Sequence, residues 1–183
     1  RACKKMTEVF QIRVTPLRRM NLPEENAVLI CVDGQRGNGN IRFVPVETVA
    51  CIDHHPVTVE GHYAYQDIRA VGSCCAIVAE YFRDLGIEPD ENTASALLYG
   101  IQVDTRQFTR GVSDLDIDMF RFLNRLANGE LLRKFQVGGI AIDDLKAYAS
   151  AIENLQIYER VGITEVEFPC SNDIIAMISD FFL

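Results

Sequence analysis

Basic residues are in deficit in this sequence. The 183 residues contain 18 Lys and Arg against 26 Asp and Glu, which gives a formal net charge of −8 at pH 7. Non-specific binding of long nucleic acid depends on a basic surface that displaces counterions from the phosphates. The charge balance therefore argues against a protein that binds long nucleic acid, although it leaves room for a small basic pocket.

Long apolar runs are also missing. No stretch is long enough to cross a membrane, and no signal-peptide pattern is present, so we expect no membrane partner. The six cysteines include no C-x-x-C pair, which argues against a structural zinc site and favours buried thiols in a reducing compartment. We therefore expect a cytoplasmic protein. Apolar residues make up 48% of the chain, enough to fill the core of a globular domain.

Histidine is scarce, with three residues in the chain, yet His54 and His55 are adjacent. They follow Asp53 at the end of an apolar stretch, residues 49–52, that predicts a short buried strand. Pro56 ends the pattern, because proline cannot continue a strand ladder. Open α/β sheets bind ligands at the carboxyl ends of their strands. Taken alone, the triplet fits either a ligand site or a solvated turn.

Two more aspartates follow apolar runs that we interpret as strands. Asp33 comes after residues 27–32, and Asp104 comes after residues 97–103. Whether residues 100–103 form a strand or continue a helix remains open at this stage. Parallel strands would bring all three acids and the imidazoles to one crevice. Carboxylates and imidazoles together suit Mn²⁺, Fe²⁺ or Zn²⁺, whereas oxygen ligands alone suit Mg²⁺ or Ca²⁺.

These strand-end residues resemble the motifs of the DHH phosphoesterase family. The family includes RecJ-like nucleases, oligoribonuclease/pAp phosphatases, polyphosphatases and family II pyrophosphatases, and the resemblance is strongest to exopolyphosphatase-related proteins. It implies an α/β fold with a mostly parallel sheet flanked by helices. Residues 1–137 would form the DHH phosphoesterase domain without its first motif. Residues 138–183 would form a linker helix and the beginning of a smaller α/β domain, with the boundary at Gly138 and Gly139.

The resemblance also implies roles for the site residues. Asp33 would bridge two metal ions, His54 would bind metal through one imidazole nitrogen, and Asp104 would be a further carboxylate ligand. Asp53 would orient a histidine from outside the metal shell, and His55 would contact the scissile phosphate. Asp53, His54 and His55 thus form the implied catalytic set. The implied cofactor is Mn²⁺, two ions at each site of the complete protein, with Mg²⁺ or Co²⁺ as alternatives.

Other residues are candidates for substrate contact, each with a structural alternative. Ser73 is a good N-cap for the next helix, and its small-residue turn is equally able to offer N–H groups to a phosphate. Arg106 and Arg110 either pair with a second phosphate or remain solvated on a loop. The glycine-rich residues 34–40 form either an ordinary turn or a loop that faces the substrate.

The rest of the pattern is mostly helical. Apolar spacing predicts helices from Ser73 to Gly86 and from Asp90 to Tyr99, a further helix from Ser113, strands within residues 157–168, and a last helix from Ser171. Asp114, Asp116 and Asp118 resemble a metal cluster on paper. The first turn of a helix favours acids through its dipole, however, and we prefer that explanation.

The chain departs from the family pattern at its beginning. Family members carry a first motif with one histidine and two aspartates, whereas residues 1–32 contain neither residue type. Because the sequence starts at Arg1 and stops inside an apolar helical pattern, both ends look cut, and we expect the first motif to lie upstream. The 183 residues alone would then bind metal weakly and would not turn over substrate.

The implied function is a Mn²⁺-dependent phosphoesterase. It would hydrolyse phosphodiester or phosphoanhydride bonds of a small phosphorylated substrate, such as a nucleotide, a short oligonucleotide or polyphosphate. A homodimer is a further expectation. The alternative is a catalytically inactive DHH-like module that binds a nucleotide or a partner for regulation.

Overall fold

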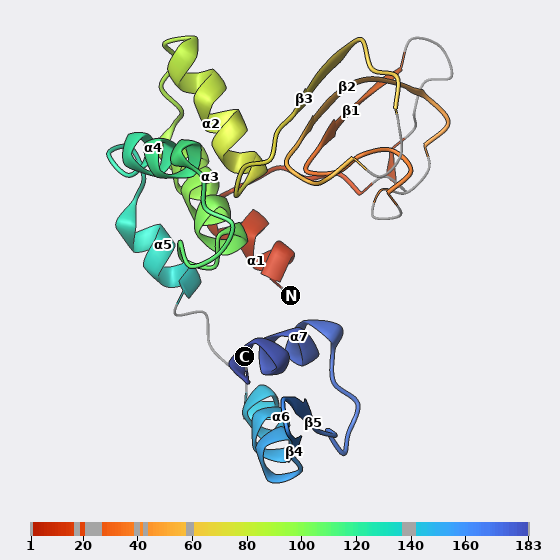
Figure 1. Cartoon of the computed structure of the whole chain (residues 1–183). Coiled ribbons are helices and arrows are strands. Elements are labelled where there is room, and N and C mark those ends of the chain that lie inside the picture. Colours follow the sequence, from red (N-terminus) through yellow and green to blue (C-terminus); the bar gives the residue numbers. More distant parts are fainter. Residues whose placement is uncertain are drawn as a thin grey trace. The chain divides into compact units, whose positions relative to one another are not determined.

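The chain divides into a larger and a smaller compact unit (Figure 1). The computed structural model describes residues 2–16, 19–20, 27–38, 41, 44–57, 61–136 and 142–182. The larger unit comprises residues 3–135, and the smaller unit is built mainly from residues 136–183. The predicted domain boundary between residues 137 and 138 lies outside the described residues, so the family roles of the two parts stay predictions.

A parallel sheet of three strands in the order β1-β2-β3 organises the larger unit. Its strands are β1 (Val28–Val32), β2 (Glu47–Asp53) and β3 (Tyr65–Ile68). Because the strands are parallel, their carboxyl ends lie at one edge of the sheet. Asp33 directly follows β1 and Asp53 ends β2, so the two acids meet there. This arrangement, with helices flanking the sheet, confirms the predicted fold class.

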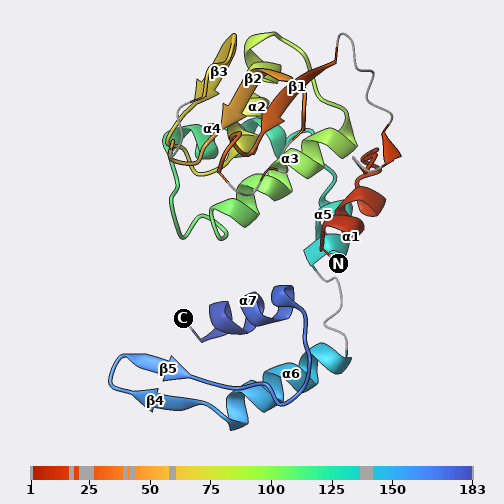
Figure 2. The ribbon, with the colours of Figure 1, turned by 90° about the vertical axis from the view of Figure 1, so that its right-hand side faces the viewer.

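Five helices accompany the sheet in the described part of the larger unit (Figure 2). They are α1 (Ala2–Val9), α2 (Cys74–Asp84), α3 (Glu91–Asp104), α4 (Asp114–Leu123) and α5 (Gly129–Gln136). The side chains of Ser73, Asp90 and Ser113 cap α2, α3 and α4 by accepting backbone N–H groups. The caps at Ser73 and Ser113 and the start of a helix at Asp90 are as predicted from the sequence. Residues 100–103 continue α3, so this segment is helical and does not form the strand that the sequence left possible. Interpreting Asp104 as a strand-end acid was wrong, because it ends a helix.

The main core lies between α2, α3 and α4. Its buried members are mostly small or aliphatic: Ala76, Ala79, Ala94, Leu98, Ile101, Met119 and Leu123. The small side chains allow α2 and α3 to approach closely. At Gly100 a Cβ atom would clash with the Sγ of Cys75. Gly100 therefore leaves the space that Cys75 of α2 occupies against α3, four residues before Asp104.

The two faces of the sheet are covered unequally. Cys31, Cys51 and Asp53 are buried on one face, at most 3% exposed, beneath the loop that follows β1. On β1 the intervening residues Val28 and Ile30 are more than half exposed. A run that is apolar throughout thus forms a strand with one covered face and one uncovered face within the described residues.

In the smaller unit two helices pack against each other, and an exposed hairpin lies between them in the sequence. Its elements are α6 (Ile142–Glu153), β4 (Gln156–Tyr158), β5 (Val161–Ile163) and α7 (Asn172–Phe181), and β4 pairs with β5 in antiparallel fashion. The strands and the last helix confirm the predictions for this region. Ala147, Ala151, Ile174 and Ile178 form its buried core.

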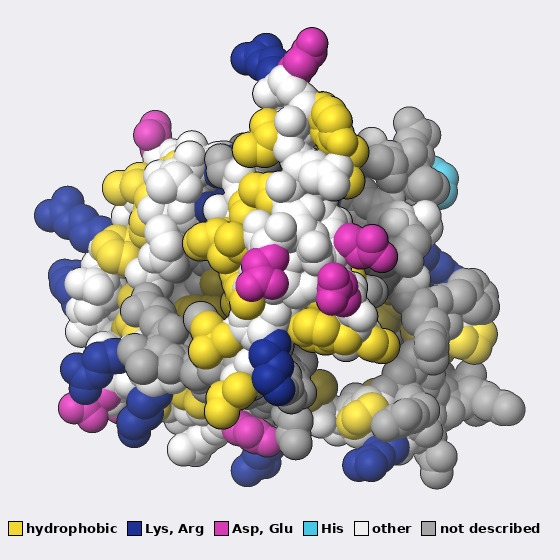
Figure 3. Space-filling model, turned by 90° about the horizontal axis from the view of Figure 1, so that it is seen from below, with side chains coloured by type: hydrophobic (Ala, Val, Ile, Leu, Met, Phe, Trp, Pro, Cys, Tyr) yellow, Lys and Arg dark blue, Asp and Glu magenta, His cyan; other side chains and the backbone are white. Residues whose placement is uncertain are grey.

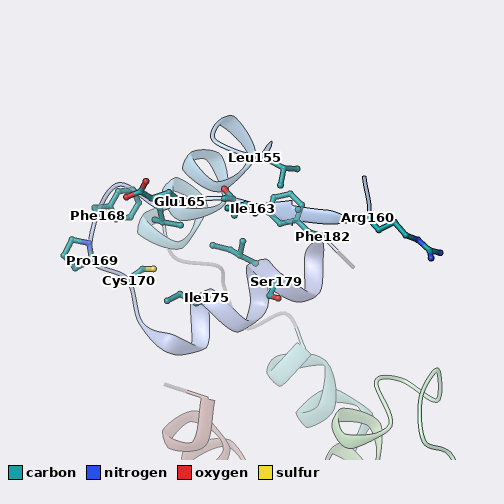
Figure 4. Close-up of a pocket in the computed structure, with 14 residues that line it drawn as sticks. Leu155, Arg160, Ile163, Glu165, Phe168, Pro169, Cys170, Ile175, Ser179 and Phe182 are labelled. Carbon is teal, nitrogen blue, oxygen red and sulfur yellow. The ribbon is translucent and has the colours of Figure 1, made fainter. Parts of the chain in front are cut away.

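A hollow of about 810 Å³ lies within the smaller unit (Figure 4). It is lined largely by apolar side chains, among them Leu155, Ile163, Phe168, Ile175 and Phe182. Large apolar side chains are also exposed at the surface of this unit, and Figure 3 shows a face of the molecule with many exposed hydrophobic groups. Among the described residues, no helix combines the length and apolarity needed to span a bilayer.

Candidate metal centre

Four side chains converge at the carboxyl ends of β1 and β2. One ligand atom from each of Asp33, Asp53, His54 and His55 lies within 4.8 Å of the others. His54 Nε2 is 3.3 Å from Asp33 Oδ1, and His55 Nδ1 is 2.8 Å from Asp53 Oδ1. The two imidazole rings meet edge to face with centroids 4.3 Å apart. Within the part of the chain that the structure describes, this is the single such cluster of His, Cys, Asp or Glu.

Asp53 is the buried hub of the cluster. Its Oδ1 accepts hydrogen bonds from the backbone N–H groups of His54 and His55 and faces His55 Nδ1, while Oδ2 accepts from Gln35 Nε2 at 2.8 Å. Burial raises the pKa of Asp53, but these hydrogen bonds outweigh it and hold the pKa below its usual value. With both oxygens occupied, Asp53 is arranged to orient His55 rather than to bind a ligand itself.

His55 is tied to this hub through one ring nitrogen. The hydrogen bond with Asp53 raises the pKa of His55, and the charges of Asp33 and Asp104 add to the effect, whereas burial opposes it. Because Nδ1 is held by Asp53, Nε2 is the ring atom left to contact a ligand. Almost half of the His55 side chain is exposed, so a ligand can reach it.

His54 is held in an orientation that suits a metal ligand. Its Nδ1 lies 3.2 Å from the carbonyl oxygen of Val71. Because a carbonyl only accepts, this contact requires the proton on Nδ1 and leaves the lone pair on Nε2. Nε2 then faces Asp33 Oδ1 at 3.3 Å. Imidazole and carboxylate ligands lie about 2.0–2.2 Å from zinc, so two of them at a right angle are about 3 Å apart. The pair therefore fits a shared divalent cation.

Asp33 adds a negative charge beside other acids at this edge of the sheet. Its backbone adopts a positive φ of 59°, a conformation that aspartate tolerates better than most residues. Burial raises the pKa of Asp33, and the charge of Asp104 raises it further, while His54 and His55 partly offset the shift. Mutual repulsion of these carboxylates is the electrostatic condition that a bound cation relieves.

Asp104 lies beside the cluster rather than inside it. It is not one of the four clustered donors, although its charge acts on Asp33. Its Oδ2 accepts a hydrogen bond from Ser73 Oγ at 2.9 Å. Ser73 is fully buried and also accepts from the N–H group of Cys75. The structure thus brings Asp33 and His54 into contact and places Asp104 near them. Metal binding by Asp104 and substrate contact by Ser73 stay predictions.

The two candidate arginines lie on the loop that follows α3. Arg106 and Arg110 are both exposed. Arg106, Gln107 and Phe108 have positive φ values of 47°, 56° and 64°, a conformation that residues other than glycine rarely adopt. The role of the arginines toward a phosphate stays a prediction.

Gln35 is a residue of this site that the sequence pattern did not indicate. It is 1% exposed, and its Nε2 also donates to the carbonyl oxygen of His55 at 3.0 Å. The neighbouring Arg36 donates to Val46 O and to Thr48 Oγ1. The described part of the glycine-rich loop is therefore tied to the sheet. The position of Gln35 two residues after Asp33 was the available signal, but nothing in the sequence distinguishes an inward glutamine from a solvated one.

The chain resembles proteins of known sequence and structure, although no family model matches it. It is 27% identical over 177 residues to the uncharacterized protein MJ1633 of Methanocaldococcus jannaschii, covering 94% of this chain and 37% of the relative. Among solved structures, a protein provisionally named a family II inorganic pyrophosphatase, from Methanococcus jannaschii, matches with a TM-score of 0.60 and 21% identity. That match covers 99% of this chain and 65% of the other.

A second solved structure gives a similar result. An exopolyphosphatase-related protein from Bacteroides fragilis matches with a TM-score of 0.56 and 16% identity, covering 72% of this chain and 42% of the other. The chain thus spans less than two thirds of each of these three proteins. At these identities the structural likeness establishes the fold. The chain has the same fold as these two solved proteins, and both carry names of groups to which its sequence was likened.

Proposed function

We propose that this protein is a metal-dependent phosphohydrolase that cleaves phosphoanhydride or phosphodiester bonds of a small phosphorylated substrate. The observation that carries the proposal is the facing pair of His54 Nε2 and Asp33 Oδ1, 3.3 Å apart, beside the buried Asp53 and His55. The names of the two solved proteins with the same fold, a pyrophosphatase and an exopolyphosphatase-related protein, support phosphoanhydrides as the first substrates to test.

The residues divide into those that would hold a cation and those that would handle the substrate. Asp33 and His54 would bind the ion, and Asp104 would add a carboxylate from α3. A divalent ion at this place supplies a Lewis acid and lowers the pKa of bound water. The mixed imidazole and carboxylate set supports Mn²⁺ rather than Mg²⁺, which prefers oxygen ligands.

His55 would bind the phosphoryl group. Its Nδ1 is held by the buried Asp53, so the ring is fixed and its Nε2 would donate a hydrogen bond to a phosphoryl oxygen. Holding a donor in place before the reaction avoids the cost of ordering it during the reaction. Phosphoryl transfer depends mainly on such positioning and on charge stabilisation. In this proposal Asp53 contributes by orienting His55.

The test is phosphate release by the intact protein with Mn²⁺, using pyrophosphate, tripolyphosphate and a short phosphodiester as substrates. His54→Ala should abolish release while the circular dichroism spectrum stays unchanged. His62→Ala is the matched control, because His62 is the third histidine of the chain and is exposed. Full activity of the His54 variant would refute the proposal. Tight nucleotide binding by the wild-type protein without turnover would favour the regulatory module instead.

A further inference from the structure

We infer that Asp116, a buried aspartate in the first turn of α4, is a positioning residue that sets the place of Asp104 beside Asp33. The inference rests on the proposed metal-dependent function, because it concerns the carboxylate that α3 would add to the metal centre. It explains contacts of Asp116 that a helix cap alone does not require.

Asp116 connects two segments that are distant in the sequence. Its side chain is 0% exposed, and its Oδ2 accepts from the N–H and hydroxyl groups of Ser113, which completes a capping box at the start of α4. The same oxygen accepts from the backbone N–H of Gly72 at 2.8 Å, 44 residues away. A cap needs the contacts with Ser113 alone, so the bond to Gly72 serves the turn before α2.

That turn has no room to move. A Cβ atom at Gly72 would lie 2.7 Å from Asp116 Oδ2, 2.7 Å from Thr105 Cγ2 and 2.8 Å from the carbonyl oxygen of Gly111. The turn is therefore pressed between the start of α4 and the residue that follows α3. A shift of Asp116 would therefore act on Gly72 through their hydrogen bond and this packing.

Ser73, the next residue along the chain, contacts a proposed metal ligand. Ser73 is buried directly after Gly72, and its Oγ donates to Asp104 Oδ2 at 2.9 Å. Asp104 itself is exposed at the end of its helix, so this hydrogen bond restrains a side chain that would otherwise be free to rotate. Asp116 thus acts on Asp104 through two consecutive residues of the turn.

The loop between Asp104 and Ser113 is held at its first end by Thr105 and at its last end by Asp116. Thr105 is fully buried, donates to Ile101 O and accepts from the N–H of Phe108. The Phe108 ring packs edge to face on Phe120 of α4 with centroids 4.9 Å apart. The left-handed residues 106–108 stay in their unfavourable conformation only while the surrounding structure holds them. Asp116 anchors the end of the loop, at Ser113.

The inference is tested by Mn²⁺ affinity, measured by isothermal titration calorimetry on the intact protein. Asp116→Asn should weaken binding about tenfold, the lower end of the range for residues that orient metal ligands. Asp114→Asn is the matched control, because it removes the same charge from the same helix turn at an exposed position. It should leave the affinity unchanged. Ser73→Ala, which removes the hydrogen bond to Asp104, should weaken binding to a similar extent.

A double-variant cycle separates positioning from a general loss of stability. In a background that already carries Asp104→Asn, adding Asp116→Asn should cause no further loss of Mn²⁺ affinity, because the residue through which it acts is gone. Additive losses, or an Asp116→Asn affinity equal to wild type, would overturn the inference. If Asp116→Asn does not fold, the same cycle with Ser73→Ala tests the last step of the path, and additive losses for Ser73→Ala and Asp104→Asn would overturn the inference.

Failure of the inference is distinguishable from failure of the proposed function. Should His54→Ala and Asp104→Asn weaken Mn²⁺ binding while Asp116→Asn and Ser73→Ala do not, the function survives and the positioning role is wrong. Should the wild-type protein bind no Mn²⁺, both are overturned together.

Discussion

Replacing Gln35 by leucine should disturb the candidate metal centre without touching any proposed metal ligand. Gln35 Nε2 donates to Asp53 Oδ2 at 2.8 Å and to the carbonyl oxygen of His55 at 3.0 Å. Both donors are lost in Gln35→Leu. Because Gln35 is 1% exposed and Asp53 is 0% exposed, water cannot readily take their place. The Asp53 Oδ2 atom is then left buried without its partner.

The size of the effect follows from the nature of the two bonds. A hydrogen bond to a charged group contributes about 1.5–3 kcal/mol, and one between neutral groups about 0.5–1.5 kcal/mol. We therefore expect Gln35→Leu to lower the free energy of unfolding by about 2–4 kcal/mol. Because the Gln35 bond also lowers the pKa of Asp53, its loss should raise that pKa. The hydrogen bond between Asp53 and His55 Nδ1 should weaken as the pKa of Asp53 rises.

The assay is urea denaturation of the intact protein, followed by Mn²⁺ titration of the folded variant. Gln66→Leu is the matched control, since Gln66 lies exposed on β3, and it should change stability by less than about 0.5 kcal/mol. An unfolding free energy for Gln35→Leu that equals the control value would refute the reasoning. It would mean that the contacts of Gln35 with Asp53 and His55 contribute nothing to the fold.

Three further predictions follow from the packing and the pKa shifts. Gly100→Ala should destabilise the protein by about 1–3 kcal/mol, because the new Cβ would clash with Cys75 Sγ. Chemical denaturation should show that Cys75→Ala recovers part of the loss, and purely additive effects would contradict the clash. The pKa of Asp53 is held below its unfolded value, so the stability that Asp53 contributes is present above the unfolded pKa of about 3.9 and is lost as the pH falls through the depressed folded pKa. Asp53→Asn should remove this acid-side dependence in unfolding measured against pH, and an unchanged profile would count against it. Burial raises the pKa of the Cys74 and Cys75 thiols to about 12, so iodoacetamide at pH 8 should leave both unmodified in the folded protein. Rapid alkylation seen by mass spectrometry would contradict the raised pKa of these thiols.

The sequence was most informative where apolar runs end in charged residues. The strand that ends in Asp53 and the strand before Asp33 were both predicted, and they place the acids and imidazoles at one edge of the sheet. Helix caps were equally clear, since Ser73 and Ser113 have side chains that accept backbone N–H groups. The convergence of Asp33 with His54 is thus observed, whereas the roles assigned to them stay predictions.

Other features depend on tertiary contacts that no local pattern reveals. Residues 97–103 are apolar enough for a strand, yet they continue α3 because Leu98 and Ile101 fill the core between helices. The third strand was missed because it is an edge strand with exposed Tyr65 and Gln66, which looks like a polar connection in the sequence. The inward orientation of Gln35 exists only once β1 and β2 are paired.

The measurement that tests the central claim most directly is anomalous X-ray diffraction from crystals of the intact protein grown with Mn²⁺. We predict one strong anomalous peak within coordination distance, about 2.0–2.3 Å, of both His54 Nε2 and Asp33 Oδ1. Peaks that lie only elsewhere, or no peak at Mn²⁺ concentrations that support phosphate release, would contradict the account.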